Sequence, residues 1–161
     1  MLSFKNSKMT SLKEGDKAPN FTVLNQDDKL LTLDTYKGKK LILYFYPKDS
    51  TPGCTAESCN LRDNYSELLA LGFEVLGVSA DSSSSHQKFI SNNQLPFHLL
   101  SDTEKEVIKA YDVWGPKKFM GKVYDGIHRT TFVIDENGLI ERVFTKVKTK
   151  EHTAQILETY K

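Results

Sequence analysis

The stretch Leu41-Ile-Leu-Tyr-Phe-Tyr46-Pro47-Lys-Asp-Ser-Thr51-Pro-Gly-Cys54 decides the fold of this chain. Its first six residues are apolar or aromatic at every position, a pattern typical of a strand that helices cover on both faces. Pro47 ends the run, and Pro52 and Gly53 fit a tight turn into a helix. We therefore predict a central strand over residues 40–46 that leads through a short loop into a helix beginning near Cys54.

The rest of the chain alternates short apolar runs with helical patterns. The predicted strands are apolar runs bounded by turn residues, at 21–24, 30–33, 73–79, 97–100, 130–134 and 139–144. The predicted helices carry a 3.6-residue apolar period, at 54–71, 84–93, 103–111 and 150–160. In the first of them we expect Leu61, Tyr65, Leu68 and Leu69 to share one buried stripe. Together these elements predict an α/β fold, with a central mixed sheet flanked by helices and an N-terminal β-hairpin.

The bulk properties predict one globular domain. The 161 residues are 39% hydrophobic and 27% charged, with a formal net charge of +1. We expect residues 1–12 to be a flexible N-terminal tail, in which Met9 is an alternative start, and residues 13–161 to form the domain. So small a net charge creates no field that would attract nucleic acid or an acidic membrane. The lysine clusters at 117, 118 and 122 and at 146, 148 and 150 are interpreted as solvated faces.

The chain shows no targeting or membrane signal. Its apolar runs are too short to cross a bilayer, and the polar first 13 residues lack the apolar centre of a signal peptide. Cys54 and Cys59 are its two cysteines. In a reducing compartment such a pair is seldom a structural staple. We therefore expect a cytoplasmic protein whose cysteines carry chemistry.

The position of Cys54 favours a reactive thiol. Unpaired backbone N–H groups of a first helical turn stabilise a thiolate over a thiol. Thr51 lies three residues earlier, where its hydroxyl could donate to the sulfur or to a bound oxygen, and Pro47 could shield the pocket from water. A thiolate held in this way is a nucleophile.

The spacing of the two cysteines excludes a disulfide within an intact helix. Residues five apart have Cα atoms about 8–9 Å apart on faces roughly 140° from each other. A disulfide needs Cα atoms within about 7 Å and converging side chains. Pairing of Cys54 with Cys59 therefore requires the first helical turns to unwind.

Other interpretations of these cysteines remain open at this point. A buried cysteine is often a small hydrophobic residue. A zinc site lacks support, because the four histidines and the carboxylates show no ligand spacing around the pair. The pair is also not C-x-x-C, which disfavours a thioredoxin-type redox motif. We expect no metal and no organic cofactor.

The segment Phe45-Tyr-Pro-Lys-Asp-Ser-Thr-Pro-Gly-Cys-Thr-Ala-Glu-Ser-Cys59 resembles the active-site signature of the peroxiredoxins, in particular the Q-type, also called bacterioferritin comigratory protein. Residues 12–21, 113–118 and 126–135 are similar to other landmarks of that family. The resemblance implies a thioredoxin-like fold. The sequence departs from the family pattern at Leu61, where many relatives carry Phe, and in the tail that precedes the usual start of the family.

The resemblance also implies roles for six residues. Cys54 matches the peroxidatic cysteine and Cys59 the resolving cysteine. Thr51 and Pro47 match the two upstream partners of the peroxidatic cysteine. Arg129 matches an arginine that would favour the thiolate and hold the peroxide oxygens. From position alone, Arg129 is better interpreted as a surface charge at a strand start. Glu57 matches a frequent glutamate of this subfamily, although a first-turn glutamate also stabilises a helix through its dipole.

The implied activity is a thioredoxin-dependent peroxidase. Its substrates would be hydrogen peroxide and alkyl hydroperoxides, and thioredoxin or a similar dithiol would recycle the Cys54–Cys59 disulfide. With both cysteines in one chain we expect a monomer. Two alternatives use the same pair: a thiol–disulfide oxidoreductase without peroxidase activity, and a non-catalytic redox sensor.

Overall fold

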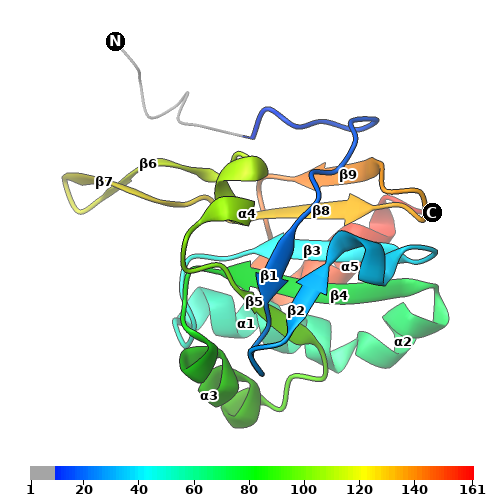
Figure 1. Cartoon of the computed structure of the whole chain (residues 1–161), viewed down its shortest axis with the longest axis horizontal. Helices are drawn as coiled ribbons and strands as arrows, with labels where there is room; N and C mark the ends of the chain where they lie inside the picture. Colours follow the sequence, from blue (N-terminus) through cyan, green and yellow to red (C-terminus); the bar gives the residue numbers. More distant parts are fainter. Residues whose placement is uncertain (1–9) are drawn as a thin grey trace.

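A five-stranded mixed sheet forms the centre of the molecule, seen in a computed structural model that describes residues 10–161 (Figure 1). Its strands run in the order β5 (His98–Ser101), β4 (Phe73–Ser79), β3 (Lys40–Phe45), β8 (Thr130–Ile134) and β9 (Ile140–Phe144). β3 lies in the middle, parallel to β4 and antiparallel to β8. The predicted central strand and mixed α/β sheet are therefore confirmed.

Alternation along β3 divides the core into two layers. Ile42 and Tyr44 pack against α1 (Pro52–Asp63), α2 (Tyr65–Ala70), α3 (Ser83–Asn93) and α5 (His152–Glu158). Leu43 and Phe45 pack on the opposite face against α4 (Glu106–Ala110), the 3₁₀ turn η2 (Leu33–Tyr36) and the hairpin of β1 (Thr22–Leu24) and β2 (Leu30–Thr32). Successive strand residues point to opposite faces, so a run that is apolar throughout supplies both layers.

The predicted helix over residues 54–71 is in fact two helices. The backbone leaves helical geometry at Asn64, with φ −111° and ψ 11°. The Asn64 side chain donates to the carbonyl oxygen of Asn60 at 2.8 Å, a local bond that competes with the helical ladder. The break turns Leu69 to solvent at 41% exposure, so the prediction that it is buried with Leu61 and Leu68 was wrong. Gly72, at φ +89°, ends the second helix in the left-handed region that glycine adopts easily.

The structure contains a hairpin of β6 (Trp114–Phe119) and β7 (Lys122–Ile127) that was not predicted from the sequence. It extends away from the body of the molecule (Figure 1). Its strands contain Gly115, Pro116 and several lysines, so the apolar alternation that reveals a half-buried strand is weak. The hairpin matters here because its second strand leads directly to Arg129.

Residues 10–12 and the last residues of the chain lie outside the sheet. Among residues 10–12, which the prediction assigns to the tail, the Thr10 hydroxyl donates to the carbonyl oxygen of Tyr111 at 2.7 Å, and Leu12 packs against the core. Met9 lies outside the described residues, and the tail boundary at residue 13 stays a prediction. At the other end, the 3₁₀ turn η3 (Thr149–Glu151) leads into α5. Within residues 10–161, no helix combines the length and the apolar content that a bilayer crossing requires.

Candidate active site

Cys54 lies at the third position of α1 and is fully buried. Thr51 is the N-cap residue, with an extended backbone (φ −85°, ψ 153°), and Pro52 occupies the first helical position. Proline is favoured there because its missing N–H would be unpaired anyway. The strand, loop and helix start are therefore arranged as predicted, with Cys54 in the first turn of α1, where the backbone N–H groups have no helical acceptor.

The Thr51 hydroxyl has a defined orientation. It donates to the carbonyl oxygen of Lys48 at 2.8 Å, so its proton is already engaged. The oxygen therefore offers a lone pair to a molecule bound beside it, rather than the proton that we expected it to donate.

Arg129 reaches the sulfur from the connection between β7 and β8. Its Nη2 donates to Cys54 Sγ at 3.4 Å, and its Nη1 donates to Glu57 Oε1 at 2.7 Å. The β3–β8 register explains the position, because Thr130 pairs with Phe45 and so Arg129 lies where β3 ends. Gly53 leaves space for the guanidinium: a Cβ there would approach Nη2 to 3.2 Å. An arginine that position alone would place on the surface is thus in contact with the candidate nucleophile.

Glu57 holds the other half of the guanidinium. It lies one turn after Cys54 and is fully buried. Burial raises the pKa of Glu57 to about 7, although the charge and the hydrogen bond of Arg129 act in the opposite direction. Burial alone would lower the pKa of Arg129, but Glu57 and Cys54 favour its charged form and raise it overall. The Glu57–Arg129 bond therefore fixes the guanidinium with one edge toward the sulfur.

Cys59 faces away from Cys54. Its partly exposed thiol donates to Oδ1 of Asn93, at the end of α3, over 3.6 Å. Both thiols are free, and α1 runs without a break through both positions. The helix would have to unwind for the two sulfurs to meet, as its geometry predicts.

A pocket of about 380 Å³ lies beside the loop that precedes α1. Pro47 and Lys48 line it on one side, and Trp114, Lys117 and Tyr124 of the β6–β7 hairpin line it on the other. The interpretation of Lys117 as a solvated charge was wrong, because it is half-buried and donates to the carbonyl oxygen of Ile127 at 2.9 Å. Burial lowers the pKa of Lys117, and the charge of Arg129 adds to this effect while Cys54 opposes it.

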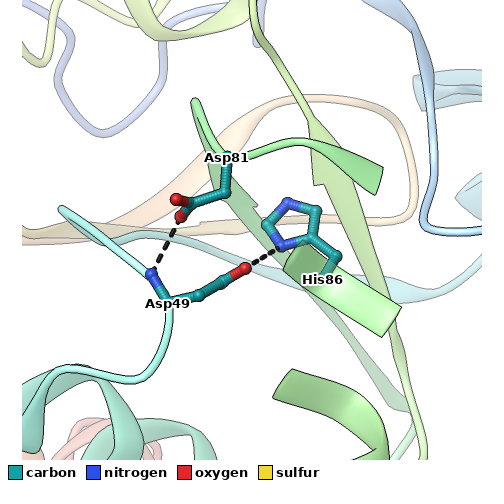
Figure 2. A group of neighbouring side chains, drawn as sticks. All are labelled: Asp49, Asp81 and His86. Carbon is teal, nitrogen blue, oxygen red and sulfur yellow. Dashed lines mark hydrogen bonds and ion pairs between the residues drawn. The ribbon is translucent and has the colours of Figure 1, made fainter. Parts of the chain in front are cut away.

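A buried polar network holds the loop that carries Thr51 (Figure 2). Asp49 accepts hydrogen bonds from Tyr46, Ser85 and His86, at 2.6, 2.8 and 2.7 Å. Its backbone N–H donates to Asp81 at 2.8 Å. Ligand atoms of Asp49, Asp81 and His86 lie within 4.8 Å of one another, a spacing that a metal ion could use. Both His86 nitrogens already face protein oxygens, however, the second being the carbonyl of Leu100 at 2.9 Å. We therefore interpret the cluster as an anchor for the loop.

The structure brings most of the predicted site residues together. Arg129 contacts both Cys54 and Glu57, Thr51 occupies the N-cap position of α1, and Pro47 lines the pocket beside the preceding loop. Cys59 lies on the same helix but on another face. Asp49, Lys117 and His152 were not predicted as site residues; His152 contacts Glu57. Asp49 lies inside the quoted motif and could have been singled out, whereas nothing local marks the other two.

Comparison with known proteins agrees with this geometry. The model of the AhpC/TSA family matches residues 14–143. The chain is 46% identical over 153 residues to the peroxiredoxin Bcp of Escherichia coli K12, covering 95% of this chain and 98% of that one. It is 44% identical over 151 residues to the peroxiredoxin Bcp of Bacillus subtilis, covering 94% and 96%.

Solved structures give the same result. The peroxiredoxin Q of Xanthomonas campestris superposes with a TM-score of 0.81 at 35% identity, over 86% of this chain and 88% of that one. The PrxQ of Xylella fastidiosa superposes with a TM-score of 0.87 at 31% identity, over 94% and 97%. The fold is therefore that of the thioredoxin-like peroxiredoxins. The chain belongs to the AhpC/TSA family, and the relatives that it resembles there are peroxiredoxins named Bcp or Q.

Proposed function

We propose that this protein is a thiol peroxidase that reduces hydrogen peroxide and alkyl hydroperoxides, with Cys54 as the attacking residue. The observation that carries the proposal is the contact of Arg129 Nη2 with the buried Cys54 sulfur, at 3.4 Å, at the start of α1. A cation and a helix N-terminus both favour the thiolate, the reactive form. The names of the relatives support the same activity.

In the first step the Cys54 thiolate attacks one oxygen of the hydroperoxide. An S–O bond forms, the O–O bond breaks, and the departing alkoxide or hydroxide takes a proton to become an alcohol or water. Arg129 stabilises the charge that develops on the oxygens, and the Thr51 lone pair accepts a hydrogen bond from the hydroperoxide. The product is a sulfenic acid on Cys54.

In the second step the start of α1 unwinds and the Cys59 thiol condenses with the sulfenic acid. A disulfide forms and water leaves. Thioredoxin or a similar dithiol then reduces the disulfide by exchange and becomes oxidised itself. Both cysteines lie on one helix, so the cycle needs no second subunit, and free thiols fit a cytoplasmic location.

Burial of Cys54 favours this function over a thiol–disulfide oxidoreductase. The sulfur has no solvent exposure in the folded helix, and a protein disulfide is too large to reach it there, whereas a peroxide is small. A redox sensor would use the same cysteines without a need for Thr51 or Arg129.

A thioredoxin-coupled assay of peroxide consumption tests the proposal. Cys54→Ser should abolish turnover. Cys59→Ser should still form a sulfenic acid that dimedone traps, but turnover should stall without an external thiol. If Cys59→Ser instead leaves Cys54 inert to peroxide, the two roles are reversed. If wild type consumes no peroxide yet forms the disulfide with another oxidant, the sensor alternative is correct.

A further inference from the structure

The two oxygens of Glu57 lie in different surroundings. Oε1 accepts from Arg129 at 2.7 Å, whereas Oε2 is buried and has no hydrogen-bond partner. Oε2 lies 3.6 Å from Nε2 of His152, the first residue of α5, which is also fully buried. A buried carboxylate oxygen without a donor is costly, so this arrangement calls for an explanation.

The hydrogen bonds of His152 determine which of its nitrogens carries a proton. Nδ1 lies 2.9 Å from Oε1 of Gln155. That amide is itself fixed, since its Oε1 accepts from the backbone N–H of Lys148 and its Nε2 donates to the carbonyl oxygen of Lys146. Nδ1 must therefore be the donor. Burial lowers the pKa of His152 to about 4, although Gln155 acts to raise it, so at neutral pH Nε2 carries no proton.

Nε2 therefore presents a lone pair and acts as a hydrogen-bond acceptor. It accepts from the Thr131 hydroxyl, 2.8 Å away, and has nothing to donate to Glu57. The 3.6 Å contact is therefore not an ion pair. The unprotonated Nε2 carries a partial negative charge 3.6 Å from Oε2, which disfavours the charged carboxylate and favours a protonated one. The raised pKa of Glu57 has the same direction.

We propose that His152 is a positioning residue for the candidate active site: its unprotonated Nε2 keeps Glu57 from ionising, so that the positive charge of Arg129 stays available to Cys54. This inference rests on the proposed function. An ionised Glu57 would neutralise the guanidinium and weaken its hold on the thiolate. His152 acts on the sulfur through Glu57 and Arg129 and contacts no reacting atom.

Other charged or titratable groups face this pair. Arg129 bonds to Glu57 and Cys54, and its charge also acts on His152. Tyr44 of β3 interacts with the charge of Glu57, and Lys117 of β6 with those of Arg129 and Cys54. Tyr44 is fully buried, and burial raises its pKa well above the ordinary value, so it stays neutral. Glu57 has a pKa raised to about 7, so its charge changes near neutral pH.

The test measures how fast iodoacetamide alkylates Cys54 between pH 4 and 10. A Cys59→Ser background leaves Cys54 as the sole thiol. We expect the rate to show a step near pH 7 that Glu57→Gln removes. His152→Gln supplies an amide donor to Oε2, so the Glu57 step should move down by about 1–2 pH units, the worth of one hydrogen bond to a charged group.

A matched substitution and a double variant separate positioning from loss of structure. His98→Gln makes the same change in β5, where the ring contacts Gln26, and should leave the step in place. In a Glu57→Gln background, His152→Gln should have no further effect on the profile. The proposal is overturned if the step is missing from wild type, if His152→Gln leaves it unmoved, or if His152→Gln alters the profile equally without Glu57.

The alkylation assay does not depend on peroxidase activity. If the step moves as expected but the wild-type chain consumes no peroxide, the proposed function fails and the role of His152 stands. If peroxide consumption is normal and the step does not move, the role of His152 fails alone.

Discussion

At the scale of single residues, Arg129 divides one guanidinium between two acceptors, Cys54 Sγ and Glu57 Oε1. A lysine keeps the charge but offers a compact ammonium, which cannot reproduce two directed contacts at these positions. We predict that Arg129→Lys lowers kcat/KM for hydrogen peroxide by about 10²–10³, the usual cost of losing one charge-stabilising donor. Arg142→Lys is the matched control, because Arg142 contacts Thr159 at the far end of α5. Equal activity of Arg129→Lys and wild type would show that the contact with the sulfur is not used.

Thr51 offers a second test at this scale, because its hydroxyl proton is engaged by Lys48. Thr51→Val removes the lone pair at nearly constant shape and should lower kcat/KM by about tenfold to a hundredfold. Thr51→Ser keeps the hydroxyl and should retain most of the activity. Steady-state assays of the two variants decide the matter: similar losses in both would mean that the methyl group matters and the oxygen does not.

At the scale of elements, the second half of α1 is bonded to the neighbouring helices, whereas its first half is held by Arg129. Asn60 donates to the carbonyl oxygen of Lys150 and accepts from the backbone N–H of Thr153, at 3.0 and 2.8 Å. Arg62 donates to the carbonyl oxygen of Asn93 at 2.8 Å. These bonds connect the helix to η3, α5 and α3 just beyond Cys59. Unwinding that begins at Pro52 should therefore stop near Asn60.

Hydrogen exchange can locate this boundary. A helical amide is protected by the carbonyl oxygen four residues earlier, so unwinding as far as Cys59 removes the acceptors of amides up to Asp63. In the oxidised protein, we therefore predict that amides over residues 54–63 exchange rapidly, while those of α2 from Leu68 on, which donates to the carbonyl oxygen of Asn64, stay protected. Asn60→Ala should extend the rapid exchange into α2, because the side-chain bonds of Asn60 to Lys150 of η3 and to Thr153 of α5 are both lost. Exchange measured by mass spectrometry on the reduced and oxidised forms gives the comparison. Loss of protection in α2 of the oxidised wild type would contradict a boundary at Asn60.

The elements also show where prediction from the sequence succeeds. Residues 41–46 are apolar or aromatic throughout, and such a run has few alternatives to a central strand. The break at Asn64 depends on a side chain that bonds its own helix, which a periodic apolar pattern does not record. The β6–β7 hairpin has exposed strands with little alternation, so periodicity carries no signal there.

At the scale of the whole molecule, the candidate site joins residues that the chain separates widely. Cys54, Glu57, Arg129 and His152 meet because β8 pairs with β3 and α5 packs beside α1 on the same face. The motif around Cys54 could be found from the sequence, since its residues are adjacent. Arg129 was found through family resemblance, and His152 was not found, because its role depends on a contact formed only when the sheet is complete.

The stability of the whole chain depends on pH, and the direction of the contribution of Glu57 can be derived from its pKa. Its pKa is raised from 4.5 to about 7 in the folded protein, so folding opposes its ionisation. Stability should therefore fall as the pH rises from 4.5 to 7, and by about 3 kcal/mol if the full shift is realised. We predict that Glu57→Gln lacks this loss.

Glu141 provides the comparison of opposite sign. Burial acts to raise its pKa, but Lys40 and Tyr160 outweigh burial and lower it, so its stabilisation is present above its ordinary pKa and is lost as the pH falls below it. Urea unfolding of the reduced protein at several pH values measures both effects. The free energy of unfolding of wild type minus that of Glu57→Gln should decrease with rising pH, and the same difference for Glu141→Gln should increase. A Glu57 difference that is flat or rises with pH would mean that the carboxyl is ionised at little cost, and Arg129 would then be neutralised at every working pH.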